Sequence, residues 1–370
     1  MAILKDIRVL ELASVLAGPS VGQFFAELGA EVIKVENLRT GGDVTRSWRA
    51  AGESAGDVSA YFSCCNWGKK SVAIDLTTPS GLEVVQRLAS TSDIVIASYK
   101  SGDAEKLGVA YDQLRLKNPK LIYGQISGYG PHSDRVGYDA VIQAESGFMD
   151  LNGERNGPPI KMPVALVDVL AAHHLKEGLL LALLNLHKTG KGALIDVSLI
   201  QAAVSSLANQ ASNWLVSKKL PTRQGSEHPN IAPYGDVFLT QDGERILLAV
   251  GSDRQFGDLL DVLGIPATER EYFSSNQDRV IHRIKLNQLL SLKISEFRTA
   301  DLLPKFHKLK IPAGIIQNVQ QAFEMPEISA MIMNAGGFSG VRNFAATSGA
   351  WVRVELTPPP HFGEHTREFV

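Results

Sequence analysis

The chain has 370 residues, of which 44% are hydrophobic and 21% charged, and its formal net charge is -2. This composition excludes a disordered or fibrous protein and gives no reason to expect nucleic acid as a partner, although a basic pocket can exist within a neutral chain. The length is that of two domains.

The cysteines and the apolar stretches bear on the compartment. Cys64 and Cys65 are adjacent, a spacing that suits neither a disulfide framework nor a tetrahedral zinc site. Charged residues interrupt the first twelve positions, so they do not form a secretory signal. The most apolar stretch, 178–186, is about half of the ~20 residues needed to cross a bilayer. We therefore predict a cytoplasmic protein without a metal site or a membrane span.

The first part of the chain alternates between strand and helix patterns. Helices are predicted after Pro19 and over 79–89, and apolar runs predict strands at 7–12, 31–36, 71–76, 93–97 and 120–127. This alternation indicates an α/β fold with a parallel sheet flanked by helices.

The second half carries one long helix and a change of composition. Leucines at helical spacing over 168–188, followed by Gly190, predict a long buried helix. Residues 220–233 are rich in Pro, Gly, Ser, His and Asn, as in a linker or an active-site loop. Strand patterns at 235–239 and 245–250, with helices near Phe256 and Ile294, then predict a smaller α+β unit.

Several motifs of other α/β enzymes are missing or misplaced. A G-x-S-x-G occurs over 18–22, but only one strand precedes it, whereas a hydrolase elbow needs an earlier loop for its oxyanion hole. Neither a G-x-G-x-x-G after the first strand nor a phosphate-binding G-x-x-x-x-G-K-[ST] is present. His173 and His174 are neighbours on a helix and point in different directions, which favours structural histidines over metal ligands.

An ordered set of motifs resembles the class III coenzyme A (CoA) transferases, the formyl-CoA and carnitine-CoA transferase family. Each motif is weak alone, but the order of the matches from Val9 to Thr366 is specific. They are Val9 to Leu12, Leu16 to Pro19, Leu28 to Glu36, Gly41-Gly42-Asp43, Asn66 to Ser71, Asp75-Leu76, Gly128 to Pro131, Gly137-Tyr138-Asp139, Gln143-Ala144, Asp168, Ile311 to Gly314 and Pro359 to Thr366.

The resemblance implies a fold that the residue pattern is compatible with. A large Rossmann-like CoA-binding domain would comprise residues 1–219 and 326–370, and a small α+β domain with linkers would comprise 220–325. The resemblance also implies an interlinked homodimer. Neither nucleic acid nor a membrane is an expected partner, and no cofactor is expected to be bound permanently, because CoA thioesters would be substrates.

The resemblance assigns Asp168 as a nucleophile that forms a mixed anhydride and then an aspartyl-CoA thioester. The local pattern alone favours a simple helix cap, since Asp is common there; a helix start also favours the ionised form by ~0.3–1 kcal/mol. The backbone N–H of Leu16 is expected to stabilise an oxyanion. Tyr138 and Asp139 are expected beside the nucleophile, where they would orient the acid substrate.

The CoA contacts implied by the resemblance lie in four segments. Basic residues among them would bind the phosphates of CoA, although surface lysines are more often simply solvated. The residues are Val15, Ala17, Arg39, Lys69, Lys70, Ser71, Ser98, Tyr99 and Lys100.

Two alternatives stay open at this point. An α-methylacyl-CoA racemase of the same fold uses a histidine where this chain has Tyr138, and a tyrosine with an ordinary pKa of ~10 is a poor proton carrier near neutrality. A CoA-binding protein without catalysis is the other alternative. The glycine run that gates the site in formyl-CoA transferases is missing at 225–230, which disfavours oxalate and formate and leaves larger acids, such as dicarboxylates or carnitine-like compounds, open.

Overall fold

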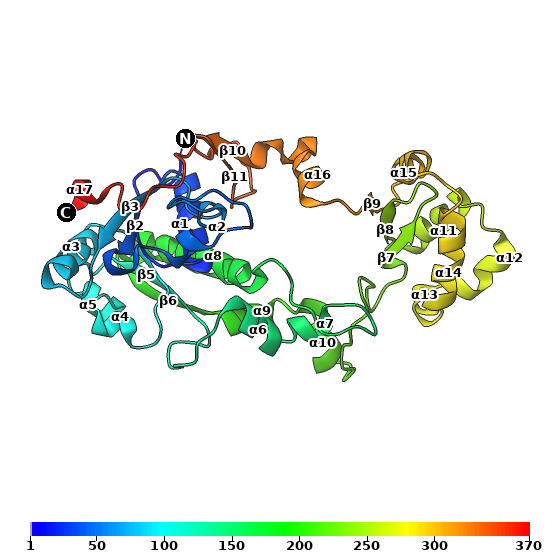
Figure 1. The fold of residues 1–370 in the computed structure, drawn as a ribbon. Coiled ribbons are helices and arrows are strands. Elements are labelled where there is room, and N and C mark those ends of the chain that lie inside the picture. Colours follow the sequence, from blue (N-terminus) through cyan, green and yellow to red (C-terminus); the bar gives the residue numbers. More distant parts are fainter. Residues whose placement is uncertain (1) are drawn as a thin grey trace. The chain divides into compact units, whose positions relative to one another are not determined.

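The computed structural model describes residues 2–370 (Figure 1). Internal contacts divide the chain into two compact units. Unit 1 runs to Phe148 and also comprises Met162–Ala208 and Ser329–Val370, and unit 2 comprises Met149–Lys161 and Asn209–Ile328. The domain limits 1–219 with 326–370, and 220–325, stay a prediction.

A six-stranded parallel sheet forms the centre of unit 1, which confirms the predicted α/β class. Its strand order is β3-β2-β1-β4-β5-β6, the order of doubly wound nucleotide-binding folds. Strand β3 begins two residues before the predicted run, so Lys69 and Lys70 belong to the sheet. The strands are β1 Arg8–Leu12, β2 Glu31–Asn37, β3 Lys69–Ile74, β4 Ile94–Ala97, β5 Ile122–Ser127 and β6 Ala193–Ser198.

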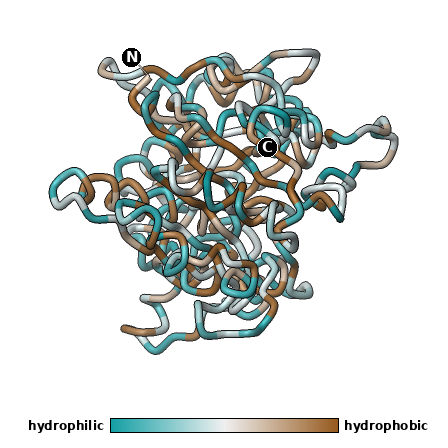
Figure 2. The backbone as a smooth tube through the Cα atoms, turned by 90° about the vertical axis from the view of Figure 1, so that its left-hand side faces the viewer, coloured by the Kyte–Doolittle hydropathy of each residue, from teal (hydrophilic) through white to brown (hydrophobic). Residues whose placement is uncertain are grey.

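Helices cover both faces of this sheet. On one face, α1, α8 and α9 pack through residues such as Val21, Leu175 and Leu179; on the other, α3 packs through Val85 and Leu88. In Figure 2 hydrophobic stretches cross the middle of the view, and many loops at its margin are hydrophilic. The helices of unit 1 are α1 Ala17–Glu27, α2 Ala60–Ser63, α3 Pro79–Ser90, α4 Asp103–Lys106, α5 Tyr111–Leu114, α6 Asp139–Glu145, α8 Leu166–Thr189, α9 Leu199–Ser205 and α17 Thr366–Phe369, with the 3-10 helices η1 Leu38–Thr40 and η2 Val44–Ser47.

The long helix α8 ends as predicted, at Gly190 in a left-handed conformation with φ 71°. The predicted burial holds on one side of the helix only. Leu175 and Leu179 have no exposed surface, but Leu181 and Leu184 are 67% and 60% exposed. The helix is apolar on several sides, and in this chain only one of those sides packs against the sheet.

Unit 2 contains the predicted α+β elements. The strand pair at 235–239 and 245–250 forms as β7 and β8, and the helices near Phe256 and Ile294 form as α11 and α14. The antiparallel sheet has the order β7-β8-β9. The strands are β7 Tyr234–Leu239, β8 Arg245–Ala249 and β9 Ala313–Ile315. The helices are α10 Ala208–Leu215, α11 Asp253–Val262, α12 Ala267–Arg270, η3 Glu271–Phe273, α13 Asn276–Ile281, α14 Arg283–Ile294, α15 Thr299–Lys308 and α16 Val319–Phe323. At the limits between the units are α7 Phe148–Leu151 and η4 Pro326–Met331.

The C-terminal segment belongs to unit 1. After the hairpin of β10 (Ile332–Ala335) and β11 (Phe338–Val341), the chain runs extended to α17, beside β3 (Figure 1). The N–H of Ala73 donates to Thr366 Oγ1 at 3.0 Å, and the N–H of His365 donates to the Ser71 carbonyl at 2.9 Å. Both ends of the chain therefore contribute to one compact unit.

Among residues 2–370, the helices are all too short or too polar to span a membrane. The same part of the chain contains no cluster of three or more His, Cys, Asp or Glu side chains that could hold a metal ion.

Candidate active site

The main candidate site lies where the strand order of the sheet reverses. After β1 the chain continues to β2 on one side of the sheet, and after β4 it continues to β5 on the other side. The carboxyl ends of the strands at such a switch point are where ligands bind in this class of fold. A cavity of about 290 Å³ is found there. The Ser14 N–H donates to Ser98 Oγ at 3.2 Å and so joins the two diverging loops. The cavity is lined by residues 14–18, 98–101, 126–128, 133, 135–138, Asp168 and Leu199.

Asp168 reaches this cavity from the first turn of α8, where it is partly buried. Burial, together with the nearby negative charge of Asp139, raises the pKa of its carboxyl to about 7. The sequence-based expectation that the helix start would favour the ionised form is therefore outweighed. The carboxyl therefore changes its charge near neutral pH.

Asp139 does not line the cavity, and its expected role in orienting the acid substrate stays a prediction. It is 8% exposed, and its carboxylate accepts hydrogen bonds from the N–H of Val167 and from Gln143 Nε2, both at 2.8 Å. It therefore ties α6 to the start of α8 and fixes the turn that carries Asp168. Tyr138, by contrast, is 60% exposed and lines the cavity.

The N-terminus of α1 forms the opposite part of the lining. Val15, Leu16, Ala17 and Gly18 all face the cavity. Within residues 2–370, no acceptor lies within hydrogen-bond distance of the amides of Leu16, Ala17 and Gly18, and α1 has no side-chain cap. Free N–H groups and the positive end of the helix dipole attract negative charge. The arrangement can therefore stabilise an anion that develops near Asp168.

The predicted CoA contacts Val15, Ala17, Ser98, Tyr99 and Lys100 are brought together in this cavity. A second cavity of about 290 Å³ adjoins it and shares Ser14 and Tyr99 with it. The sequence analysis missed this second cavity, although the Gly41-Gly42-Asp43 motif falls on it. Its lining comes from the ends of β1, β2 and β3 and includes Glu36, Asn37, Thr40, Gly42, Asp43 and Asp75.

Four predicted CoA contacts are not brought to Asp168. Lys69 has no exposed side-chain surface and pairs with Glu11 at 2.7 Å, so its ammonium is not available to a phosphate. Lys70 pairs with Glu31 and Glu368, near the start of β2 rather than its carboxyl end. Ser71 is buried and donates to Glu36. Arg39 is exposed on η1, between two residues that line the second cavity.

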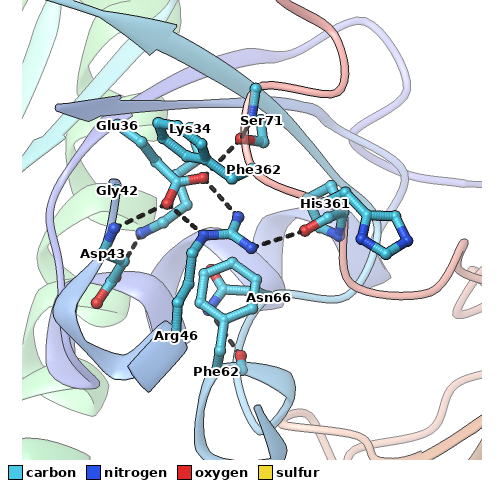
Figure 3. A network of polar contacts seen from close by, with 12 residues as sticks. Lys34, Glu36, Gly42, Asp43, Arg46, Phe62, Asn66, Ser71, His361 and Phe362 are labelled. Carbon is cyan, nitrogen blue, oxygen red and sulfur yellow. Dashed lines mark hydrogen bonds and ion pairs between the residues drawn. The ribbon is translucent and has the colours of Figure 1, made fainter. Parts of the chain in front are cut away.

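A network of buried ionic groups contributes Lys34, Glu36 and Asp43 to the lining of the second cavity (Figure 3). Lys34 Nζ lies 3.0 Å from both Glu11 and Asp43. Arg46 binds both oxygens of Glu36, at 2.6 and 2.8 Å. Burial alone would raise the pKa of the Asp43 carboxyl, but the adjacent Lys34 ammonium lowers it, so Asp43 is ionised. The sequence signal for this network was the presence of Lys34 and Glu36 within an otherwise apolar strand.

The fold and the site together define a class: a Rossmann-like protein that presents a carboxylate and the uncapped N-terminus of a helix to one cavity. The family within this class follows from comparison. Residues 4–366 match the family described as CoA-transferase family III, and the chain belongs to this family. The resemblance seen in the sequence is thereby confirmed, and the protein is a CoA-transferase.

Named relatives match over nearly the whole chain. It is 40% identical to succinate–glutarate CoA-transferase of Agrobacterium fabrum, covering 98% of this chain and 93% of that protein. It is 33% identical to human succinyl-CoA:glutarate CoA-transferase, covering 98% of this chain and 84% of that one. A crystal structure of a CaiB/BaiF family protein from Brucella suis matches with a TM-score of 0.87 and 38% identity, covering 99% of this chain and 98% of that one.

Proposed function

We propose that this CoA-transferase moves CoA from a donor acyl-CoA to a free dicarboxylic acid, with Asp168 as the covalent nucleophile. The observation that carries the proposal is the position of Asp168 in one cavity with the unpaired amides of Leu16, Ala17 and Gly18. A carboxylate that attacks a thioester needs both of these: a nucleophilic oxygen, and donors for the oxyanion that forms.

The reaction divides into two matched halves. The Asp168 carboxylate attacks the thioester carbonyl and expels the CoA thiolate, which leaves a mixed anhydride. The thiolate then attacks the aspartyl carbonyl and releases the donor acid, which leaves an aspartyl-CoA thioester. The acceptor carboxylate attacks that carbonyl and expels the thiolate again. Finally the thiolate attacks the acceptor's carbonyl in the new anhydride, which yields product and free Asp168.

The raised pKa of Asp168 suits this use of the site. A carboxyl with a pKa of about 7 is easily neutral, and its ionised form is poorly solvated. A poorly solvated carboxylate is a stronger nucleophile than one surrounded by water, because less solvent must be displaced before attack. The helix N-terminus then binds the negative charge as it moves to the oxygen of the former carbonyl.

The two adjoining cavities support an extended ligand such as CoA. We propose that the pantetheine arm passes Ser98, Tyr99 and Lys100, and that the nucleotide end occupies the second cavity, which shares Tyr99 with the first. Lys100 and Arg135 are the cationic side chains that line the first cavity. Both carry donors for phosphate or carboxylate groups. Arg135 Nη2 bonds Glu145 at 2.7 and 2.9 Å, so a ligand would bind the other N–H groups of this guanidinium.

The names of relatives support a dicarboxylic acid as acceptor. The relatives from Agrobacterium fabrum and human are named for succinate and glutarate, and one from Haloarcula marismortui, 33% identical, is named for mesaconate. A relative from Acetobacter aceti, also 33% identical, is named for oxalate. The missing glycine run leads us to propose acids larger than oxalate for this chain.

We also propose that the chain acts as a homodimer in the cytoplasm, without a permanently bound cofactor. The exposed leucines of α8, Leu181 and Leu184, support the dimer, because apolar residues of this size are more often covered in a working assembly. Sedimentation of the purified protein tests this part: a monomer at micromolar concentration would refute it.

The test of the mechanism is to trap the intermediate. The protein is incubated with succinyl-CoA or glutaryl-CoA and then with hydroxylamine, and peptides are examined by mass spectrometry. We expect a hydroxamate on Asp168, which Asp168→Asn cannot form, and CoA transfer to the other acid. The matched control is Asp93→Asn, at the opposite end of β4, which should react like the parent. Exchange of the α-proton of a 2-methylacyl-CoA without any adduct would instead indicate a racemase, and binding of CoA without either reaction a non-catalytic protein.

A further inference from the structure

Val15 has a backbone conformation that its side chain disfavours. Its φ is 72°, in the left-handed region, which a β-branched residue rarely adopts without an external constraint. Val15 stands between the end of β1 and the first turn of α1, and both it and Leu16 line the cavity with Asp168. The direction of the Leu16 N–H depends on this strained peptide, because φ and ψ of one residue orient the next peptide plane.

Asp43 provides the constraint. The N–H of Val15 donates to both carboxylate oxygens of Asp43, at 3.2 and 3.3 Å, and Cys65 Sγ lies 3.6 Å from the Val15 carbonyl oxygen. Asp43 is itself fixed, because its Oδ1 accepts from the N–H and the hydroxyl of Thr45, at 3.1 and 2.8 Å. Only 4% of Asp43 is exposed, so water does not compete for these bonds.

Lys34 connects Asp43 to the strand that leads into the turn. Its ammonium lies 3.0 Å from Asp43 Oδ2, 3.0 Å from Glu11 Oε1 and 2.8 Å from the Ala13 carbonyl oxygen (Figure 3 shows Lys34 and Asp43). Lys34 has no exposed surface. The Lys34 ammonium thus fixes the position of the Asp43 carboxylate relative to the end of β1. The turn after β1, which contains Val15, therefore has little conformational freedom.

We propose that Asp43, held by Lys34, is a positioning residue: it keeps Val15 in the left-handed conformation so that the amides of Leu16 and Ala17 are aimed at the carbonyl that Asp168 attacks. The proposal rests on the proposed function for its catalytic consequence, but its structural part stands on the Val15–Asp43 contact alone. Without Asp43, the turn relaxes to a negative φ, and the amides of Leu16 and Ala17 no longer converge on one point.

Hydrogen exchange tests the structural part without any activity. In the unaltered protein we expect the Val15 amide to exchange at least about 100-fold more slowly than the Leu16 amide, because only the former has an acceptor. Fragmentation mass spectrometry resolves single amides over residues 13–20. In Asp43→Asn the protection of Val15 should fall at least about tenfold. Equal exchange of the two amides in the unaltered protein would overturn the proposal, even if no variant folds.

Kinetics test the catalytic part. Asp43→Asn is expected to lower kcat for CoA transfer about 10- to 100-fold, less than the about 100- to 1000-fold lost when an oxyanion donor is removed outright, with a much smaller change in KM for the acyl-CoA. In a Val15→Gly background, Asp43→Asn should reduce kcat by a factor at least about threefold smaller than it does in the parent, because glycine adopts φ 72° without strain. A purely structural role predicts no such rescue.

Asp93→Asn is the matched control, since Asp93 also accepts a backbone N–H, from Arg8 at 2.8 Å, but at the amino end of β4. It should leave kcat and the exchange of Val15 unchanged. If Asp43→Asn lowers Val15 protection but Val15→Gly rescues nothing, the catalytic consequence is refuted. If the unaltered protein forms no Asp168 adduct with any donor, the proposed function fails, while the exchange result still decides the role of Asp43.

Discussion

Replacing Asp168 by asparagine should stabilise the protein at high pH, although it should abolish the chemistry. The pKa of this carboxyl rises from 3.8 to about 7 on folding, because burial disfavours its charge and Asp139 repels it. The folded state therefore binds more protons than the unfolded state between these two values, and stability falls as the pH rises through that window. Below pH 3.8 the Asp168 carboxyl is protonated in both the folded and the unfolded state, so it does not reduce stability. Above about pH 7 it is ionised in both states, and the loss of stability is complete.

The magnitude follows from the size of the shift. About three pKa units correspond to ~4 kcal/mol at full development, and partial exposure of the carboxyl reduces this to about 2–3 kcal/mol. Asp168→Asn should therefore unfold in urea with a free energy about 2–3 kcal/mol above that of the parent at pH 8. At pH 4 the two proteins should differ by less than ~1 kcal/mol.

The control for this experiment is Asp57→Asn, which is expected to change the stability at high pH in the opposite direction. Burial raises the pKa of Asp57, but hydrogen bonds from the Phe362 N–H and from His361 more than compensate, so its pKa is lowered on folding. Asp57→Asn should therefore lose stability at pH 8 and lose less as the pH falls through the lowered pKa. If Asp168→Asn shows the same stability difference from the parent at pH 4 and pH 8, the carboxyl has an ordinary pKa and the reasoning is refuted.

The remaining predictions use urea unfolding and adduct kinetics. Adduct formation on Asp168 should be half-maximal near pH 7 and fall about tenfold per unit below it; a midpoint under pH 5 would contradict this. Burial lowers the pKa of Lys176 to about 8, so its charge destabilises the folded state near neutral pH. Lys176→Met should therefore raise the free energy of unfolding by about 2–3 kcal/mol at pH 7 and by little at pH 10.5, and an equal increase at both pH values would refute the burial argument. Gly128→Ala places a Cβ 2.7 Å from Gly137 Cα and should cost about 1–3 kcal/mol; a neutral change would show that these loops move apart. Arg46→Lys keeps the positive charge but loses the two-pronged contact with the Glu36 carboxylate, and should lower the free energy of unfolding by about 2 kcal/mol. An unchanged free energy of unfolding would mean that a single ammonium contact to Glu36 is sufficient.

The candidate nucleophile illustrates what local sequence patterns leave undecided. Asp168 at a helix start is read most simply as a cap, and the ordered motifs along the chain were needed to single it out. The contacts of its neighbour Asp139 could not be predicted in this way. That carboxylate binds the Val167 amide, 28 residues further along the chain, a contact that depends on how α6 and α8 pack.

The sequence by itself determined the parallel α/β sheet and the end of the long helix at Gly190, because local periodicity and turn residues specify these features. Only the tertiary structure decided which basic residues face a ligand. Lys69 and Lys100 look alike in the sequence, but Lys69 is enclosed against Glu11 while Lys100 lines the cavity. Burial, the raised pKa of Asp168 and the strained φ of Val15 all depend on neighbours distant in the chain, and residue-by-residue preferences carry no information about those neighbours.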